Sequence, residues 1–472
     1  MNPTKVLVIG LDCYTPQLAF DQYRERLPNL KGLMKTGYWG NLRSCDPPIT
    51  VPAWTCMMTS KDPGQLGFYG FRNRKDHTYE ALYFANSLAV REPTIWNLLS
   101  RNRMDSVLIG IPQTYPTKPL RGHLVTGFLA PDTRSDYTYP EGLKAEVEKA
   151  ADGYIIDVKD FRTDNKDWLR EQVYEMTEKR FRVVHHLLET KPWHFFMFVE
   201  MGPDRLHHGF WRYCDAGHRL YEPGNPYENV LLDYYAFLDE KIGKLLAEVD
   251  FRDTTVLVVS DHGAKGMRGG ICVNEWLLQE GYLRLKKEPK SVSRLRMEDI
   301  DWTGTKVWGE GGYYSRLFFN VEGREPQGVI PMGAYERMRS EIIEKLEALG
   351  DERGNPIGTR VHRPEDLYRT TRNVPPDLIA YFGDLDWRSV GSVGTGSIHT
   401  FENDTGPDDA NHDYNGLFVL ADPRIAASQR GRELQGISLY DIAPTVLGCL
   451  GLGAPDELLG ERILEKADKG SG

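Results

Sequence analysis

Short apolar runs recur along the chain, and most of them are continuous rather than alternating. They lie at Val6–Leu11, Val107–Ile111, Phe195–Val199, Thr255–Val259, Leu378–Phe382 and Leu417–Leu420. A strand that is buried on both faces of a parallel sheet has this continuous apolar pattern. The pattern therefore predicts a mostly parallel central sheet.

Segments with helical periodicity separate these runs. They are Thr94–Arg103, Trp168–Leu188, Val230–Val249, Tyr335–Leu349 and Leu439–Leu447. Alternation of strands and helices is typical of an α/β fold whose helices cover both faces of the sheet. We expect residues 1–262 and 331–472 to form this α/β core.

The stretch 263–330 differs from the rest of the chain. It contains two glycine-rich segments, 266–270 and 309–314, and a basic segment, Lys286–Arg296. We expect an inserted cap that binds substrate, although an ordinary surface excursion would have the same composition. Its aromatic residues could stack on a nucleobase, but packing in a hydrophobic core explains them better. These aromatic residues are Trp276, Trp302, Trp308, Tyr313 and Tyr314.

Composition and charge narrow the function. The formal charge of −10 leaves no basic surplus, which argues against a protein that coats nucleic acid. The negative charge does not exclude a small phosphorylated substrate, because bound metals supply local positive charge. The six cysteines form no CxxC motif, so neither a thiolate zinc site nor a disulfide framework is indicated. No apolar run is long enough for a membrane span or a signal peptide, and we expect a cytoplasmic protein.

Acidic and imidazole side chains follow three of the predicted strands: Asp12, Asp204, His208, Asp261 and His262. In an open α/β sheet, ligands bind beyond the carboxyl ends of the strands, so these residues can converge. Each residue also has a simpler explanation, since an aspartate after a strand is often a turn residue or a helix cap. Asp204 and His208 face the same way only if their segment is helical.

His412 lies in a polar loop, 391–415, just before the last predicted strand, and could reach the same edge. The set would then hold three aspartates and three histidines. Such a set suits zinc or manganese, and it also accepts iron. Several carboxylates at one sheet edge repel each other unless cations offset their charge. We therefore expect two divalent metal ions, with zinc preferred and manganese as the alternative.

Thr50 stands in the segment Asp46–Thr59. Pro52 suits the first turn of a helix, so a helix should begin near Val51, with Thr50 at its N-cap. On local grounds a capping role is the simpler explanation. A coordinated threonine hydroxyl can however ionise near neutral pH, and a helix N-terminus stabilises the anionic oxygen. Thr50 is thus a candidate nucleophile.

Taken in order, these segments resemble the type I phosphodiesterase and nucleotide pyrophosphatase branch of the alkaline phosphatase superfamily. Val8–Asp12 is similar to its first metal-ligand strand, and Thr50–Thr55 is similar to its nucleophile helix. Ser260–Gly263 resembles its most recognisable ligand pair, and Asp441–Leu447 resembles its closing helix. The resemblance covers roughly residues 5–452. Within the superfamily, 204–211, 274–277 and 320–328 resemble the prokaryotic phosphohydrolase-or-phosphomutase group.

The resemblance implies an alkaline phosphatase-like core with two metal sites. One site would use Asp204, His208 and His412, and the other Asp12, Asp261 and His262 with the Thr50 oxygen beside it. It also implies a hydrolase in which Thr50 attacks phosphorus and water hydrolyses the phosphothreonyl intermediate. The expected substrate is a small phosphate ester, with a nucleotide or related phosphodiester as the first choice.

Three positions depart from the family pattern or stay open. His207 stands where a glycine often precedes the ligand histidine, so either His207 or His208 could bind, and the spacing favours His208. The last histidine usually has a glycine neighbour, which His412 lacks, and His399 is the alternative. Asn73 could contact phosphate, although a turn role fits it better.

Rival functions share parts of the pattern. A phosphomutase or phosphomonoesterase would use the same metals, but phosphomutases tend to use serine as the nucleophile. Residues 45–49 match a sulfatase motif only in part, because the arginine of that motif is missing. A catalytically silent scaffold protein would have no physical need for six such residues at one sheet edge. A scaffold should purify without stoichiometric metal, which separates it from a hydrolase.

Overall fold

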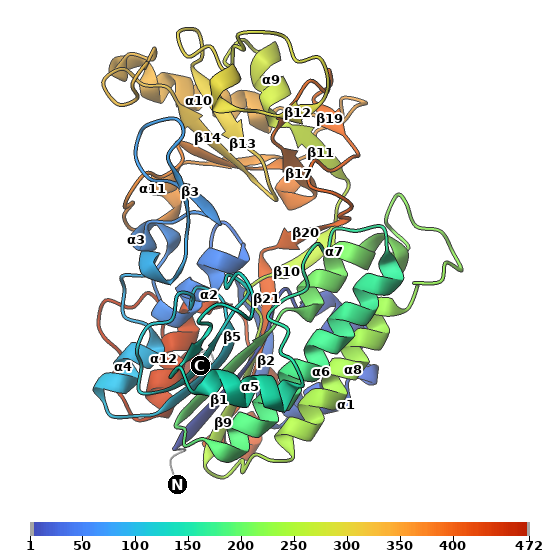
Figure 1. The fold of residues 1–472 in the computed structure, drawn as a ribbon, viewed down its shortest axis with the longest axis vertical. Coiled ribbons are helices and arrows are strands. Elements are labelled where there is room, and N and C mark those ends of the chain that lie inside the picture. Colours follow the sequence, from blue (N-terminus) through green and yellow to red (C-terminus); the bar gives the residue numbers. More distant parts are fainter. Residues whose placement is uncertain (1–3, 470–472) are drawn as a thin grey trace.

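The chain folds into two lobes, a large lower one and a smaller upper one (Figure 1). The computed structural model describes residues 4–469. A ten-stranded sheet forms the centre of the lower lobe. Its path runs β22-β2-β21-β9-β1-β8-β5-β6-β7, and β23 pairs with β2. The strands are β1 Lys5–Leu11, β2 Tyr38–Arg43, β5 Ser106–Ile111, β6 Gly122–Thr126, β7 Thr138–Tyr139, β8 Phe195–Glu200, β9 Thr254–Val259, β21 Asn415–Ala421, β22 Arg432–Glu433 and β23 Ile437–Ser438.

The middle of this sheet is parallel. Strands β9, β1, β8, β5 and β6 pair in parallel, whereas β21 is antiparallel to both of its neighbours. Every residue of β5, β8 and β9 is buried, as the continuous apolar runs predicted. The predicted α/β class with a mostly parallel sheet is confirmed.

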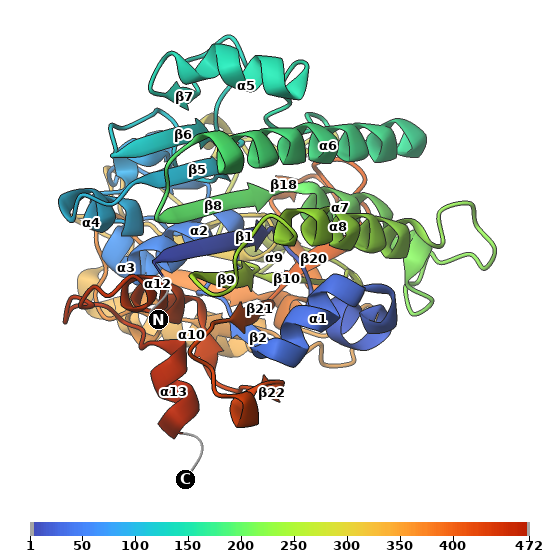
Figure 2. The ribbon, with the colours of Figure 1, turned by 90° about the horizontal axis from the view of Figure 1, so that it is seen from below.

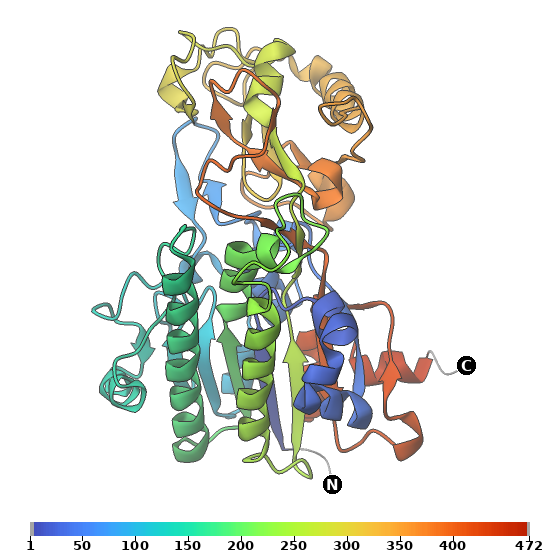
Figure 3. The same ribbon diagram turned by 90° about the vertical axis from the view of Figure 1, so that its right-hand side faces the viewer.

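Helices cover both faces of the sheet (Figures 2 and 3). One layer contains α1, α6, α7 and α8, and the opposite layer contains α2, α4 and α12. The helices of the lower lobe are α1 Pro28–Thr36, α2 Thr50–Thr59, α3 Pro63–Leu66, α4 Ile95–Arg101, α5 Leu143–Ala151, α6 Lys166–Thr190, α7 Gly202–Cys214, α8 Val230–Leu246, α12 Ile442–Cys449 and α13 Ile463–Lys469. Within residues 4–469, no helix is both long and apolar enough to cross a membrane.

The upper lobe has its own hydrophobic core, whose buried residues run from Ile271 to Val393. Its strands form a four-stranded antiparallel sheet, β13-β14-β16-β15, and a three-stranded sheet, β17-β11-β19. The elements are β11 Gly269–Cys272, α9 Val273–Gln279, β12 Ser293–Arg294, β13 Val307–Glu310, β14 Ser315–Phe319, α10 Tyr335–Glu347, β15 Arg360–His362, α11 Pro364–Leu367, β16 Leu378–Tyr381, β17 Trp387–Val390, β18 Ser392–Val393 and β19 His399–Thr400.

This lobe extends beyond the stretch 263–330 that the sequence set apart. The apolar run Leu378–Phe382 does form a strand, β16, but it pairs with β14 and β15 rather than joining the central sheet. An apolar run shows that a strand is buried without showing which sheet buries it. The aromatic residues Trp276, Trp302 and Trp308 pack in the core of this lobe, as the simpler explanation expected.

Two features connect the lobes. Strands β10 (Gly263–Gly266) and β20 (Ala410–Asp413) form a two-stranded antiparallel sheet at the connection (Figure 1). A tyrosine-rich cluster also crosses the boundary, and the Tyr314 hydroxyl donates to the Tyr69 carbonyl at 2.5 Å within it. The upper lobe is therefore docked on the lower lobe by packing as well as by the chain connections.

Candidate metal centre

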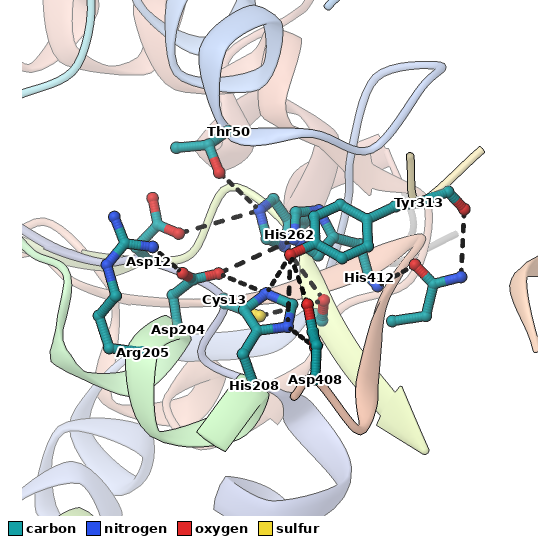
Figure 4. A network of polar contacts seen from close by, with 12 residues as sticks. Asp12, Cys13, Thr50, Asp204, Arg205, His208, His262, Tyr313, Asp408 and His412 are labelled. Carbon is teal, nitrogen blue, oxygen red and sulfur yellow. Dashed lines mark hydrogen bonds and ion pairs between the residues drawn. The ribbon is translucent and has the colours of Figure 1, made fainter. Parts of the chain in front are cut away.

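The carboxyl ends of β1, β8 and β9 meet at one edge of the central sheet, because these strands are parallel neighbours. Asp12 follows β1 directly, and Asp261 and His262 follow β9 after one residue. Asp204 and His208 lie on α7, which begins just after β8, and their four-residue spacing places them on one face of that helix. These segments bring the side chains together at one edge of the sheet, and Figure 4 shows Asp12, Asp204, His208 and His262 among them.

The first group contains Asp12, Asp261 and His262. One ligand atom from each lies within 4.8 Å of the others, and all three residues are fully buried. His262 Nε2 is 3.3 Å from Asp261 Oδ2 and 3.9 Å from Asp12 Oδ1. Two ligand atoms on a tetrahedral zinc ion are separated by about 3.3 Å, since each lies about 2.0–2.1 Å from the metal. The spacing therefore suits a divalent cation.

The second group surrounds Asp204. Its Oδ1 atom is 3.2 Å from His208 Nε2 and 3.8 Å from His412 Nε2. Ligand atoms of Asp204, His262 and His412 also lie within 4.8 Å of one another. The rings of His262 and His412 stack with centroids 3.8 Å apart. The two expected metal sites are thus adjacent parts of one buried cluster.

For His262 and His412, the Nδ1 atom hydrogen-bonds to a backbone carbonyl rather than to a carboxylate. His262 Nδ1 donates to the Gly263 carbonyl at 3.1 Å, and His412 Nδ1 donates to the Pro48 carbonyl at 2.9 Å. Since a carbonyl oxygen can only accept, both neutral rings carry their proton on Nδ1. The lone pair on Nε2 then faces the carboxylates, as in histidines that bind a metal.

Three buried polar atoms of the cluster have no hydrogen-bond partner within the described chain: Asp12 Oδ1, Asp261 Oδ2 and His412 Nε2. All three belong to the two groups above. A buried polar atom without a partner costs free energy comparable to a lost hydrogen bond. Cations would satisfy all three atoms at once, so the donor set and its spacing fit divalent metals.

The charges of the cluster support the same conclusion. Burial, together with the charge of Asp204, raises the pKa of Asp12 well above its usual range, and burial and Asp12 do the same for Asp261. Burial also acts to raise the pKa of Asp204, but His208 and Arg205 outweigh it and lower this pKa. Ionisation of all three carboxyl groups in one buried site costs free energy, because the charges repel each other and are desolvated, unless positive charge is added.

Thr50 is the first residue of α2, and Ile49 takes the N-cap position, one residue earlier than predicted. Because Ile49 and not Thr50 occupies the N-cap, the threonine hydroxyl is not at the capping position. It lies 3.2 Å from His262 Nε2 instead, and the residue is only 4% exposed. The simpler explanation, a helix cap, therefore does not account for this side chain.

The alternative residues lie elsewhere. His207 Nε2 is 3.0 Å from the Tyr235 hydroxyl, on the side of α7 that faces α8. His399 is in the upper lobe, where its Nε2 donates to the Gly350 carbonyl at 2.8 Å. Asn73 closes a turn, since its side chain accepts from the Tyr69 amide and donates to the Gly70 carbonyl. The structure groups His208 and His412, rather than these three, with the carboxylates.

A family model described as type I phosphodiesterase/nucleotide pyrophosphatase matches residues 6–408. The chain belongs to that family. The family and its members' chemistry indicate a phosphoesterase-type hydrolase that acts on small phosphate esters. No curated protein matches the chain significantly by sequence.

Several solved structures have a similar fold. Human ectonucleotide pyrophosphatase/phosphodiesterase 5 superposes with a TM-score of 0.57 at 12% identity, over 98% of this chain and 99% of that chain. An inactive threonine-to-alanine variant of the murine protein, in complex with AMP, gives 0.55 at 12% identity over 98% and 99%. Phosphonoacetate hydrolase from Sinorhizobium meliloti, in complex with phosphonoformate, gives 0.58 at 15% identity over 95% and 96%. These likenesses show the alkaline phosphatase-like fold.

Several residues around the cluster of this family member were not predicted. Trp54 Nε1 donates to Asp12 Oδ2 at 2.6 Å. Arg205 contacts Asp204 and also binds Asp157 through two hydrogen bonds of 3.0 and 2.7 Å. Trp54 lies one helical turn after Thr50, and Arg205 is adjacent to Asp204, so their spacing offered a local signal.

Asp408 was missed as a site residue, and Tyr313 was named only as an aromatic residue for which core packing was preferred; both reach the cluster from distant segments. The Tyr313 ring stacks on His412 with centroids 4.1 Å apart, and its hydroxyl is 3.1 Å from His208 Nε2. Asp408 Oδ1 accepts from His208 Nδ1 at 2.8 Å. Only their places in segments already singled out, 263–330 and 391–415, could have drawn attention to them.

Proposed function

We propose that this chain is a two-metal phosphodiesterase that acts on nucleotides or related phosphodiesters through a phosphothreonyl intermediate on Thr50. The observation that carries the proposal is the position of the Thr50 hydroxyl. It lies 3.2 Å from His262 Nε2 of the Asp/His cluster, in the first residue of a helix whose N-cap is Ile49. The inactive threonine-to-alanine variant of the murine relative, seen with AMP, supports both the nucleophile and the nucleotide class.

Asp12, Asp261 and His262 would hold one divalent ion, and Asp204, His208 and His412 would hold the other. When bound, the ions would neutralise the buried carboxylates, favour ionisation of the Thr50 hydroxyl and offset charge on the phosphoryl oxygens. Zinc is our first choice and manganese our second, since both suit aspartate and histidine ligands.

The protein's own residues supply the nucleophile and its orientation. Thr50 Oγ1 forms a bond to phosphorus while the bond from phosphorus to one ester oxygen breaks, and that alcohol leaves with a proton. Water then attacks the phosphothreonyl diester, which releases a phosphate monoester and restores the Thr50 hydroxyl. The N-terminal amides of α2 favour negative charge beside this oxygen. Burial of the cluster limits competing access of bulk water.

The test compares hydrolysis of bis-p-nitrophenyl phosphate, p-nitrophenyl phenylphosphonate and p-nitrophenyl phosphate, with zinc or manganese added. We expect diester or phosphonate activity in the wild type and a loss on the order of 10³-fold or more in Thr50→Ala. Thr55→Ala is the matched control, since Thr55 lies in the same buried helix and its hydroxyl donates to the Val51 carbonyl at 3.0 Å. It should keep activity within about threefold.

Each other outcome would change the proposal. Monoester preference would favour a phosphomonoesterase or phosphomutase of the same superfamily. Equal activity in Thr50→Ala and wild type would exclude Thr50 as the nucleophile. A protein that neither turns over any ester nor binds metal would be a scaffold on this fold.

A further inference from the structure

A buried carboxylate lies behind one of the histidines of the cluster. Asp408 is 5% exposed and sits in the loop that leads into β20. Its Oδ1 atom accepts a hydrogen bond from His208 Nδ1 at 2.8 Å (Figure 4). On the other side of the same ring, His208 Nε2 faces Asp204 Oδ1 at 3.2 Å. Each ring nitrogen of His208 thus faces a carboxylate oxygen, and the contact with Asp408 is the shorter of the two.

The second carboxylate oxygen of Asp408, Oδ2, is surrounded by hydrogen-bond donors. Arg162 Nε donates to Oδ2 at 2.9 Å, and Arg388 Nη1 donates to it at 3.2 Å. The Tyr313 hydroxyl lies 3.3 Å from the same oxygen. Arginine has no acceptor atom, so Oδ2 must remain an acceptor. The carboxylate is thus locked in one orientation, with Oδ1 directed at His208.

These contacts come from both lobes. Arg162 belongs to the lower-lobe loop before α6, whereas Arg388 lies on β17 and Tyr313 between β13 and β14 of the upper lobe. The Arg388 guanidinium also lies 5.4 Å from the centre of the Tyr313 ring. Asp408 therefore joins the metal-facing histidine to the upper lobe through direct polar contacts.

We propose that Asp408 is a positioning residue that keeps the proton of His208 on Nδ1 and its Nε2 lone pair directed at Asp204. It thereby sets the metal affinity of the position formed by Asp204, His208 and His412. This inference rests on the proposed function, since it takes His208 to be a metal ligand. Hydrogen-bonding partners behind ligating histidines typically change metal affinity by about 10–100-fold when they are replaced.

Replacement of Asp408 by asparagine tests the orientation directly. The amide keeps the shape of the carboxylate but offers one acceptor oxygen and one NH₂ donor. The two arginines require the oxygen, so the NH₂ group must face His208 Nδ1. That nitrogen then has to accept, which moves the ring proton to Nε2. A protonated Nε2 has no lone pair for a metal.

The experiment titrates zinc into metal-free protein against a chromophoric chelator. Wild type should bind two ions, and Asp408→Asn should weaken one of them by about 10–100-fold while the other changes by less than about threefold. Asp404→Asn is the matched control, because Asp404 lies in the same loop and is 3.8 Å from Arg388 without contacting a histidine of the cluster. It should leave both affinities within about threefold of wild type.

A second measurement separates positioning from a merely structural role. Asp408→Asn should lose diester activity at limiting zinc and recover most of its kcat at saturating zinc, with an unchanged melting temperature. If Asp408→Asn does not fold, Arg388→Gln replaces it, and a weaker loss at the same single site is expected.

Three results would overturn the inference. Wild-type affinities at both sites in Asp408→Asn, with two ions bound by the wild type, would refute it and leave the proposed function intact. Equal weakening of both sites with a lowered melting temperature would show a structural role only. A wild type that binds no metal would overturn the proposed function and this inference together.

Discussion

Trp54→Phe should destabilise the metal-free protein more than the same substitution at a tryptophan nearer the surface. The indole Nε1 of Trp54 donates to Asp12 Oδ2 at 2.6 Å, and both residues are fully buried. Asp12 Oδ1 has no hydrogen-bond partner among residues 4–469, so the substitution removes the carboxyl group's one side-chain hydrogen bond. Leaving a buried acceptor unpaired costs about 1–3 kcal/mol. The smaller ring also leaves a cavity of roughly 40 Å³, which adds about 1 kcal/mol.

Together these effects give about 2–4 kcal/mol. The unfolding entropy of a chain of 472 residues is about 1 kcal/mol/K, so the melting temperature should fall by about 2–4 °C if the chain unfolds cooperatively. The assay is calorimetric unfolding of chelator-treated protein. Trp39→Phe is the control, because Trp39 is half-buried and its Nε1 donates to a neutral carbonyl, that of Gly431, at 3.1 Å. A fall in Trp54→Phe no larger than in Trp39→Phe would refute the reasoning.

Three further predictions concern the same edge of the sheet. Gly10→Ala should cost about 1–3 kcal/mol in urea unfolding, because the new Cβ atom would lie 2.7 Å from the Trp54 ring, and an unchanged midpoint would contradict it. Chelation should lower the melting temperature of the wild type, and zinc at 100 times its Kd should restore about 2.7 kcal/mol for each site that it fills. An unchanged melting temperature after chelation would speak against a metal centre. His207→Gln should keep zinc affinity within about threefold, since His207 faces Tyr235, whereas His208→Gln should lose at least about tenfold. The reverse order would assign the ligand to His207.

Local sequence was sufficient to predict that the residues which follow the parallel strands lie close together. Asp12, Asp204 and Asp261 each come shortly after a continuous apolar run, and parallel neighbours end at the same edge. No long-range information is needed for that step, beyond the assumption that the runs share a sheet. Asp204 and His208 were expected to share one face only if their segment is helical, and α7 is that helix.

The assumption of a shared sheet failed for Leu378–Phe382. This run is as apolar as the others, yet β16 pairs with β14 and β15 in the upper lobe. Hydrophobicity reports burial and not the partner strand. For the same reason the sequence underestimated the upper lobe, since its core is completed by strands far beyond residue 330.

The contacts of Asp408 and Tyr313 with the cluster were not predicted, for a different reason. Their roles depend on which segments meet across the lobe boundary, and no local pattern encodes a hydrogen bond between His208 and a residue 200 positions away. The polar composition of 391–415 indicated a functional loop without indicating its contacts.

The pairing of β10 with β20 is where the fold and the chemistry depend on each other most closely. In this two-stranded sheet His412 lies opposite Ala264, and Ala264 follows His262 by two residues. Side chains alternate between the faces of a strand, so a slip of one residue would turn His412 away from Asp204 and bring a neighbour to face the cluster. The same pair of strands joins the two lobes. Asp408, two residues before β20, is bonded to Arg388 of the upper lobe. The segment that carries His412 is therefore held by contacts to both lobes, through Pro48 in the lower lobe and Arg388 in the upper lobe. If Asp408 orients His208 as proposed, the upper lobe contributes to a cluster whose other candidate ligands come from the lower lobe.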